Sequence, residues 1–281
     1  MQRTPFSQVL KSAKIDLRRE YERLYGMFCL QKFANGSGGY VTLREICDAR
    51  FMDLPFRGTC VSLDDFDDFY GYDFKKNPSD VDINYLVSFC EYSYNIVKER
   101  KELNSILSFL DFGEIMKLYI RQVLTVMESI GYMVNKQGGV SDFVPKDQVA
   151  ISVAEIIDPS LSYRVIEYNH HSMRGDLERK KAILLALADK LEPERATLKS
   201  INATLESDLF CLFNNVKLRH NNADPTGQYY RPIVAAMNEE EVETWYDETY
   251  QMCLVAFLEL EQNDRKNRVN QLKKELSNNG K

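Results

Sequence analysis

Apolar residues recur at helical spacing along most of this 281-residue chain. The first such pattern starts at Leu17, continues through Tyr21, Leu24 and Phe28, and stops at a glycine-rich segment over 35–39. Positions three and four apart share one face of an α-helix. The pattern therefore predicts a first helix of about 18 residues that ends at the glycines.

The helical pattern is interrupted over 36–80 and then returns. In 36–80, proline, glycine and aspartate alternate with short apolar pieces, which is typical of a loop-rich segment with short helical turns. Two helices are predicted after it, one from 81 through Val97 and a longer one from Leu103 to Ile130, which Gly131 ends. Residues 132–144 contain two β-prone pieces around a glycine pair, so we expect a small hairpin there, ended by Pro145.

The rest of the chain has the pattern of a helical bundle over 146–262. Two short helices are predicted at 149–157 and 161–168, and Asp176 is a suitable N-cap for the next. After Pro193, one helix is predicted with the buried residues Leu198, Ile201, Leu205, Leu209, Leu212 and Val216. Asn238 and Glu241 have capping-box spacing and start a last helix with the buried face Val242, Trp245, Thr249, Cys253, Ala256 and Leu260.

These patterns predict a mainly α protein, a helical bundle with a small β-hairpin and an irregular N-terminal segment. Residues 1–145 form an N-terminal helical region, 146–262 the bundle, and 263–281 a charged tail that is expected to fray. The composition, 44% hydrophobic and 28% charged, suffices to bury a real core. A formal net charge of −6 argues against a broad nucleic-acid-binding surface and leaves room for a small basic site.

The spacing of the six cysteines and the length of the apolar runs indicate where in the cell the protein is expected. The cysteines lie far apart, without a CxxC pair, and most fall within apolar stretches, so they are interpreted as reduced core residues. The first residues have no continuous apolar segment typical of a signal peptide, and no apolar run approaches the length of a membrane span. We therefore predict a cytoplasmic protein that does not associate with membranes.

Five aspartates in the loop-rich segment raise the question of a metal site: Asp64, Asp65, Asp67, Asp68 and Asp73. Hard cations prefer several carboxylate oxygens, but the spacing lacks the DxDxDG pattern and distal glutamate of a calcium loop. Aromatic residues alternate with these aspartates. The segment is interpreted as a solvated acidic face with aromatic anchors, and no metal or other cofactor is predicted.

The chain has only three histidines, and one of them stands beside an arginine in LRHNNAD over 218–224. Arg219 and His220 follow a predicted core helix, where positive charge is favoured near the exposed carbonyl groups. Asn221 and Asn222 can then end the helix in a left-handed turn. A structural role of this kind and a functional site are weighed about equally.

The other two histidines, His170 and His171, lie in YNHHSMRGD. A helix end followed by Gly175 as breaker and Asp176 as N-cap explains this stretch as structure, and that reading is favoured. If the protein uses an imidazole as a general base near neutral pH, the base is His170, His171 or His220.

The segment GDLERKKAILLALADKLEP, followed by a long helix and FNNVKLRHNNAD, resembles the C-terminal helical domains of bacterial abortive-infection proteins. It resembles the HEPN (higher eukaryotes and prokaryotes nucleotide-binding) superfamily more distantly, and the resemblance covers 163–261. It implies an all-helical, often dimeric bundle whose active members cut RNA without metal. Their motif is an arginine, a polar residue and, several positions on, a histidine.

Within this resemblance, Arg219 matches the motif arginine and His220 the polar residue after it. Asp224, Pro225 and Thr226 stand where the final histidine is expected. Either His220 itself, or His170 or His171 brought in by the fold or a dimer partner, supplies the base, or this chain does not cut RNA by that route. An imidazole would remove the 2′-hydroxyl proton and a guanidinium would hold the phosphoryl charge.

Three functional hypotheses follow. The first is an antiphage defence ribonuclease with Arg219 and His220 as catalytic residues and with the substrate-binding residues Asn215, Asn221, Asn222, His170 and His171. RNA is then the substrate, and a homodimer and a protein partner encoded nearby are expected. The second is a non-catalytic helical sensor or partner-binding module of a defence system. The third, a metal-dependent nuclease using the aspartates of 64–73, is disfavoured because no acidic triad with a lysine stands in a strand context.

Overall fold

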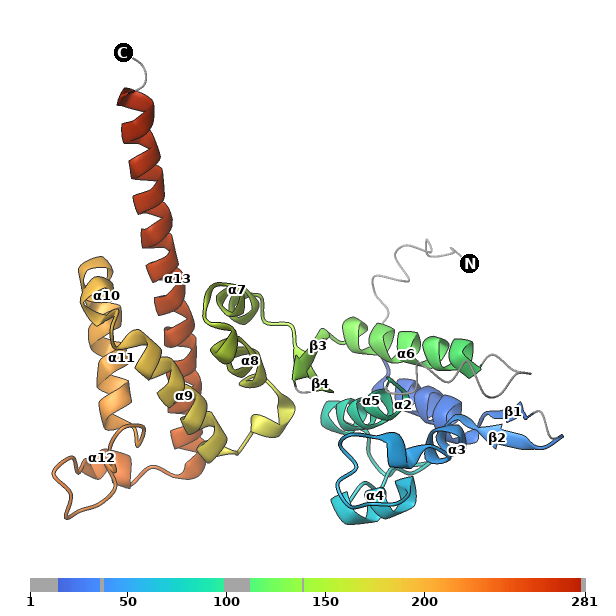
Figure 1. Ribbon diagram of the computed structural model, residues 1–281. Helices are drawn as coiled ribbons and strands as arrows, with labels where there is room; N and C mark the ends of the chain where they lie inside the picture. Colours follow the sequence, from blue (N-terminus) through green and yellow to red (C-terminus); the bar gives the residue numbers. More distant parts are fainter. Residues whose placement is uncertain (1–14, 36–37, 99–111, 138, 279–281) are drawn as a thin grey trace, which may run out of the picture. The chain divides into compact units, whose positions relative to one another are not determined.

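The computed structural model describes residues 15–35, 38–98, 112–137 and 139–278. It is mainly helical, with two small antiparallel sheets of two strands each (Figure 1). The predicted fold class is confirmed. The chain divides into two compact units, Met1–Pro145 and Lys146–Lys281. Among the described residues, no helix combines the length and apolar character needed to cross a membrane.

The N-terminal unit alternates helices with two hairpins. Its elements are α2 (Leu17–Tyr25), the π-helix η1 (Gly26–Leu30), β1 (Lys32–Ala34), β2 (Tyr40–Thr42), α3 (Leu43–Asp48), the short 3₁₀ helix η2 (Phe51–Asp53), α4 (Leu63–Tyr70), α5 (Ile83–Lys98), α6 (Phe112–Ser129), β3 (Tyr132–Gln137) and β4 (Val140–Pro145). The helices predicted after residue 81 are present as α5 and α6, and the 103–111 part of the second lies outside the described residues.

The first helix is shorter than the apolar spacing predicts. It ends as a π-helix at Leu30, and the next residues form β1, which pairs antiparallel with β2 so that Phe33 lies opposite Val41. The turn is closed at Asn35, whose backbone N–H donates to Gly39 O (2.8 Å) and whose Oδ1 accepts from Gly39 N (2.6 Å). A three-residue strand carries too little periodicity to be distinguished from a helix end by sequence.

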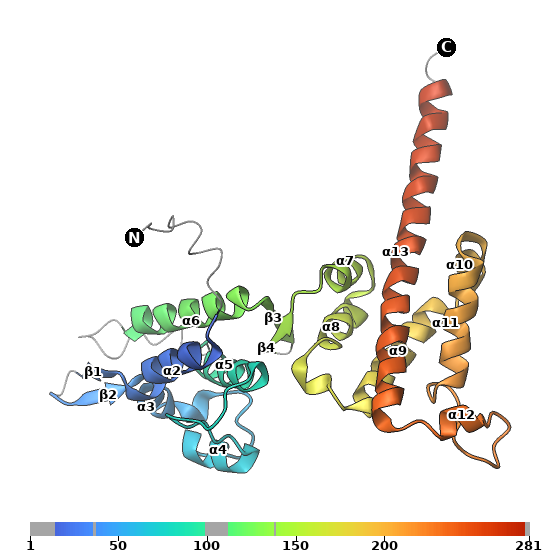
Figure 2. The same cartoon turned by 180° about the vertical axis from the view of Figure 1, so that it is seen from behind.

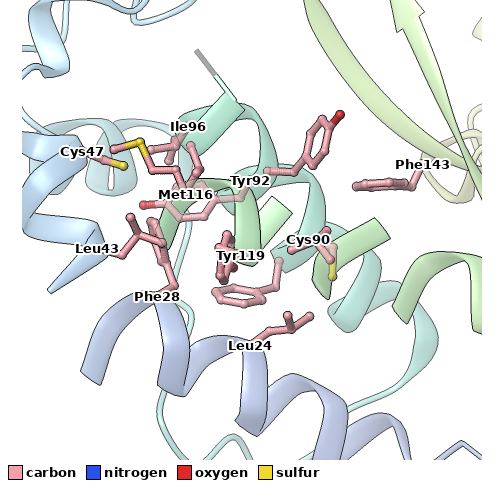
Figure 3. Packing of buried hydrophobic residues seen from close by; sticks show 14 of the residues in the cluster. Leu24, Phe28, Leu43, Cys47, Cys90, Tyr92, Ile96, Met116, Tyr119 and Phe143 are labelled. Atoms are coloured by element: carbon pink, nitrogen blue, oxygen red, sulfur yellow. The ribbon is translucent and has the colours of Figure 1, made fainter. Parts of the chain in front are cut away.

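The core of the N-terminal unit is aromatic and lies between α2, α5 and α6 (Figure 3). Leu24, Phe28 and Tyr119 are fully buried there, and the Phe28 and Tyr119 rings lie 5.6 Å apart. The predicted hairpin is confirmed as β3 and β4. It is bound to α5 by Asn95, whose side chain donates to Ser141 O (2.7 Å) and accepts from Ser141 N (2.8 Å).

The aspartate-rich segment packs as the N-terminal part of α4 and its flanks. Arg44 of α3 binds Asp64 (2.8 Å) and Asp67 (2.7 Å), while Phe66 is buried and Phe69 is 68% exposed. Aromatic anchoring is therefore present. Asp67, however, is partly buried, and desolvation raises its pKa despite the neighbouring Arg44. The expectation of a wholly solvated acidic face is wrong at Asp67, because Arg44 holds this carboxylate against the protein.

The C-terminal unit is all helical in its described part (Figure 2). Its elements are α7 (Gln148–Ile156), α8 (Pro159–Glu167), the 3₁₀ turn η4 (His171–Met173), α9 (Leu177–Leu191), α10 (Arg195–Ile201), α11 (Ala203–Asn215), α12 (Pro232–Ala235) and α13 (Glu239–Asn278). Asp176 caps α9 by accepting from Arg179 N (3.0 Å), as predicted. Gly175, just before it, has a φ of +78°.

The single helix predicted after Pro193 is broken in two at Asn202. This residue has an extended backbone, with a φ of −146°, and its side chain accepts from Leu205 N to cap α11 (3.0 Å). It also donates to Glu259 of α13 (2.9 Å). The break changes which residues face the core: Phe210 and Phe213 are buried and Ile201 is exposed.

The last helix begins as predicted and continues further than predicted. Asn238 and Glu241 form both hydrogen bonds of the capping box, each 2.9 Å long. Of the predicted buried face, Trp245 is instead 41% exposed and its neighbour Tyr246 is buried. The charged tail is helical to Asn278 in the structure, so the expectation of a frayed tail is wrong there. Both views show α13 running past the other helices of its unit (Figures 1 and 2).

Candidate functional site

The loop that carries Arg219 and His220 is built around Asn222, which is fully buried. The Asn222 side chain accepts from Lys217 N (3.0 Å) and donates to the carbonyl oxygens of Asn214 (3.1 Å) and Tyr229 (2.9 Å). Lys217 has a φ of 63°, and in the described residues no other non-glycine residue has a positive φ. Both N–H donors of the Asn222 amide are thus used within the loop, so this buried side chain is not available to donate to a substrate.

Arg219 is held by neighbouring structure rather than presented freely. Its Nη2 lies 2.6 Å from Oε2 of Glu192, just after α9, and its backbone N–H donates to Phe213 O (3.0 Å). The guanidinium also lies over the ring of Phe213, 5.3 Å from its centroid, and 21% of the side chain is exposed. The arginine therefore ties the loop to the ends of α9 and α11.

A second arginine extends this arrangement. Arg195 of α10 binds the buried carboxylate of Glu206 (2.6 Å), lies over the ring of Phe210 (4.2 Å) and approaches Glu192 at 3.9 Å. Arg195 and Arg219 thus share Glu192 and the aromatic side of α11. This cluster is not predicted by the sequence, because a continuous helix after Pro193 would place these side chains differently.

His220 is the most available group of the predicted site. Its ring stacks on Tyr229 with centroids 3.7 Å apart and planes 9° from parallel. Within the described part of the chain, its ring nitrogens make no hydrogen bond. The imidazole lines an open pocket of about 510 Å³ together with Lys181, Lys217 and Arg219, and Tyr246 of α13 forms part of the wall.

The remaining predicted residues of this loop have local partners. Asn215 donates to Cys211 O (2.8 Å) and accepts from Arg231 Nε (3.1 Å). Asn221 lines the pocket and accepts from Ala223 N (3.3 Å). Asp224, which stands in place of the expected second histidine, accepts from the hydroxyl and backbone N–H of Thr226, and these hydrogen bonds lower its pKa. A carboxylate with a lowered pKa is a weak base near pH 7.

The two adjacent histidines lie between α8 and α9, away from this pocket. Their rings are 4.3 Å apart, and Nδ1 of His170 lies 2.7 Å from Ser172 Oγ and accepts from Ser172 N (3.2 Å). Neither His170 nor His171 lines the pocket that holds Arg219 and His220. The fold of one chain therefore brings together Arg219, His220 and Asn221 and leaves the histidine pair outside.

A second polar cluster of the C-terminal unit, formed around Lys180, was also not indicated by the sequence. The buried Lys180 of α9 binds Glu243 (2.7 Å) and Asp247 (2.6 Å) of α13. Tyr168 donates to Asp247 (2.9 Å) and stacks on Tyr250 with centroids 4.0 Å apart. Burial raises the pKa of Tyr168. In the sequence, Lys180 stands within RKK and resembles a solvated residue of an exposed face.

Glu243, one of the two acidic partners of Lys180, has a lowered pKa. Burial raises this pKa, but the hydrogen bonds from the Lys180 ammonium and the Gly175 backbone N–H lower it more, so the net pKa lies below its usual value. A buried lysine with two carboxylate partners holds α9 and α13 in one relative position. We interpret this cluster as the structural link between the two helices, α9 and α13, that both line the pocket.

Comparison with protein-family models, curated proteins and solved structures gave no match. The resemblance to abortive-infection proteins therefore stays a prediction from short sequence segments.

Proposed function

We propose that the C-terminal unit is a non-catalytic binding module that senses RNA in an abortive-infection-type bacterial defence system. The observation that carries the proposal is the ion pair between Arg219 and Glu192. A catalytic arginine has to direct its guanidinium at the phosphoryl oxygens on which charge develops. Here the guanidinium is engaged by a carboxylate at 2.6 Å and rests on an aromatic ring, which favours a structural role for the motif arginine.

Besides the engaged Arg219, the pocket offers a ligand two lysines, one imidazole and two carboxylates, Glu178 and Glu239. Lys181 and Lys217 line the pocket with His220, whose nitrogen atoms are free to donate or accept. The aromatic groups that line the pocket are the His220 ring, which stacks on Tyr229 outside the pocket lining, and the Tyr246 ring. Proteins bind single-stranded RNA by this combination of phosphate contacts from cations and base stacking on aromatic rings. A small pocket also agrees with an acidic chain that lacks a broad basic surface.

The test is fluorescence anisotropy of a labelled single-stranded RNA with wild type, Lys181→Ala/Lys217→Ala and Lys199→Ala. Lys199 is an exposed lysine on α10 that does not line the pocket, so its loss is the matched control. The double variant should weaken binding at least about tenfold and reduce the salt dependence by about one phosphate contact per lysine. Equal affinities for all three proteins, or no binding by wild type, would overturn the proposal.

Cleavage by His220 is the second candidate, favoured by the unbonded imidazole at the pocket. It is tested by incubating the same RNA with wild type and His220→Asn in excess EDTA, which also removes any metal-dependent nuclease activity. A positioned general base contributes roughly a hundredfold to ten-thousandfold in rate. Loss of cleavage of that size in His220→Asn, with RNA affinity retained, would establish the ribonuclease. Binding without cleavage by wild type supports the sensing module.

A further inference from the structure

Helix α13 carries a second apolar stripe, on the face that points away from its own bundle. The bundle face consists of buried residues such as Tyr246, Cys253, Ala256 and Phe257. The other stripe, here called the outer seam, consists of Val255, Leu258, Gln262, Arg265, Val269, Leu272 and Leu276. At about 100° per residue, the outer seam is centred roughly 150° around the helix from the bundle face.

The outer seam has the spacing of a coiled coil and is exposed to solvent, except that Leu258 is half-buried. Its members are separated alternately by three and four residues, which is a heptad repeat. The exposed fractions are 45% for Val255, 49% for Val269, 54% for Leu272 and 65% for Leu276. The helix is still beside its neighbours at Glu259, which bonds Asn202, and its C-terminal part extends past them (Figures 1 and 2). Exposed apolar residues at heptad spacing mark a surface for another helix.

We propose that the outer seam pairs with the outer seam of a second copy of this chain, as an antiparallel two-helix coiled coil. The polar residues of the seam decide the direction. If the two-fold axis passes between Gln262 and Arg265, each Gln262 faces the Arg265 of the other copy. The apolar positions then meet one another: Leu258 faces Val269, and Val255 faces Leu272. A parallel pair in register would instead place two Arg265 side chains against each other in the seam, which is unfavourable.

The charges beside the seam agree with the antiparallel arrangement. Glu261 and Arg268 occupy the same flanking position in successive heptads, so each Arg268 lies opposite the Glu261 of the other copy, twice in the symmetric pair. Within one copy, Arg268 already reaches Glu261 at 3.0 Å. In the parallel alternative, Glu261 would lie opposite Lys266, but Arg268 would lie opposite Lys273, a like charge, whereas neither flanking pair is repulsive in the antiparallel arrangement. The charge pattern therefore selects a second copy of this chain running in the opposite direction.

The overlap sets the expected strength. From Val255 to Leu272 the seam is about 27 Å long at 1.5 Å per residue. An interface of this length belongs to the small end of specific interfaces, so we expect dissociation constants on the order of micromolar. The seam does not include residues that line the Arg219 and His220 pocket. The pairing therefore goes beyond the proposed RNA sensing, and the result of testing one proposal does not decide the other.

Sedimentation equilibrium of the full chain over a range of concentrations tests the pairing. Wild type should show a monomer–dimer equilibrium, and Leu272→Glu should raise the dissociation constant at least a hundredfold. Asn267→Glu adds the same charge on the opposite side of the helix and should behave as wild type. Circular dichroism checks that both variants remain helical. A wild type that is monomeric up to about 100 µM, well above the micromolar range expected, or a Leu272→Glu variant that dimerises like wild type, would overturn the proposal.

The direction is tested by exchanging the flanking charges. In an antiparallel pair, Arg268→Glu should weaken the dimer, because the introduced carboxylate lies opposite Glu261 of the other copy. In a parallel pair the same substitution would tighten the dimer, because the introduced carboxylate would lie opposite Lys273. The double variant Glu261→Arg/Arg268→Glu should restore the wild-type dissociation constant of the antiparallel pair. A tighter dimer for Arg268→Glu alone, with the helix content unchanged, would refute the antiparallel arrangement.

Discussion

Replacing the buried Asn222 by alanine tests whether the loop that follows α11 is held by one side chain. The substitution removes three hydrogen bonds, one from Lys217 N and two to the carbonyl oxygens of Asn214 and Tyr229. The loop then loses the side chain that joins its two ends. The change also leaves Lys217, with its positive φ of 63°, without the acceptor for its backbone N–H.

The expected cost follows from the exposure of the groups left unpaired. A buried donor or acceptor without a partner costs about 1 to 3 kcal/mol. Tyr229 is exposed, so its carbonyl group can bind water, while the fully buried position of Asn222 keeps water from replacing its side chain. We therefore expect a loss of about 2 to 3 kcal/mol in the free energy of unfolding. For a domain of this size, that corresponds to a fall in melting temperature of roughly 10 °C.

Unfolding of the C-terminal unit can be followed on its own. The chain has one tryptophan, Trp245, and it lies in α13. Asn221→Ala is the matched control, because Asn221 is exposed and its side chain makes one hydrogen bond of 3.3 Å within the loop. That variant should stay within about 0.5 kcal/mol of wild type. Equal melting temperatures for the two variants would refute the assignment of Asn222 as the support of the loop.

Further predictions concern the buried lysine, the pH dependence and the thiols. Lys180→Met should lower the free energy of unfolding by about 2 to 3 kcal/mol, measured by urea denaturation, because the mostly buried Glu243 loses its partner while the half-exposed Asp247 can bind water. The lowered pKa of Glu243 stabilises the fold above its ordinary value of 4.5, and this stabilisation is lost as the pH falls through the lowered pKa. Glu243→Gln should make the melting temperature depend less on pH in that acidic range. Ellman's reagent should label Cys211, the exposed cysteine, rapidly in the native protein, and Cys211→Ser should abolish this fast phase.

The sequence patterns predicted the elements correctly where a segment's own residues determine its structure. The capping box at Asn238, the N-cap at Asp176 and the hairpin over 132–144 each depend on neighbours a few positions away, and each is present. The break at Asn202 was missed because the apolar spacing of three and four continues across it. Asn202 ends α10 and caps α11 through Leu205 N, and its second bond, to Glu259 in α13, cannot be read from the sequence.

The C-terminal part of α13 was missed for a different reason. Its side chains are solvated, so a core-facing stripe was not available to predict a helix. In the structure it is supported by ion pairs within the helix, such as that between Arg265 and Glu261 at 2.8 Å. The exposed hydrophobic residues of this part stand between many charged residues, so their heptad spacing was not recognised from the sequence.

The candidate site was predicted in part. The sequence placed Arg219, His220 and Asn221 on one loop, and the structure gathers them at one pocket. The role of Asn222 was not visible, because residue type alone does not separate a buried asparagine from an exposed one. The partner of Arg219 was not visible either, since two helices, α10 and α11, separate Glu192 from Arg219 in the sequence and only the fold of the unit brings them together.

Helix α13 connects the pocket to the outer seam. Its first turns, with Val242 and Tyr246, form one wall of the pocket, and the same uninterrupted helix ends at Asn278. At 1.5 Å per residue this helix is about 60 Å long, so a tilt of about 5° at the pocket would move its far end by about 5 Å. A tilt of α13 about its first turns would therefore move the outer seam much further than the pocket wall.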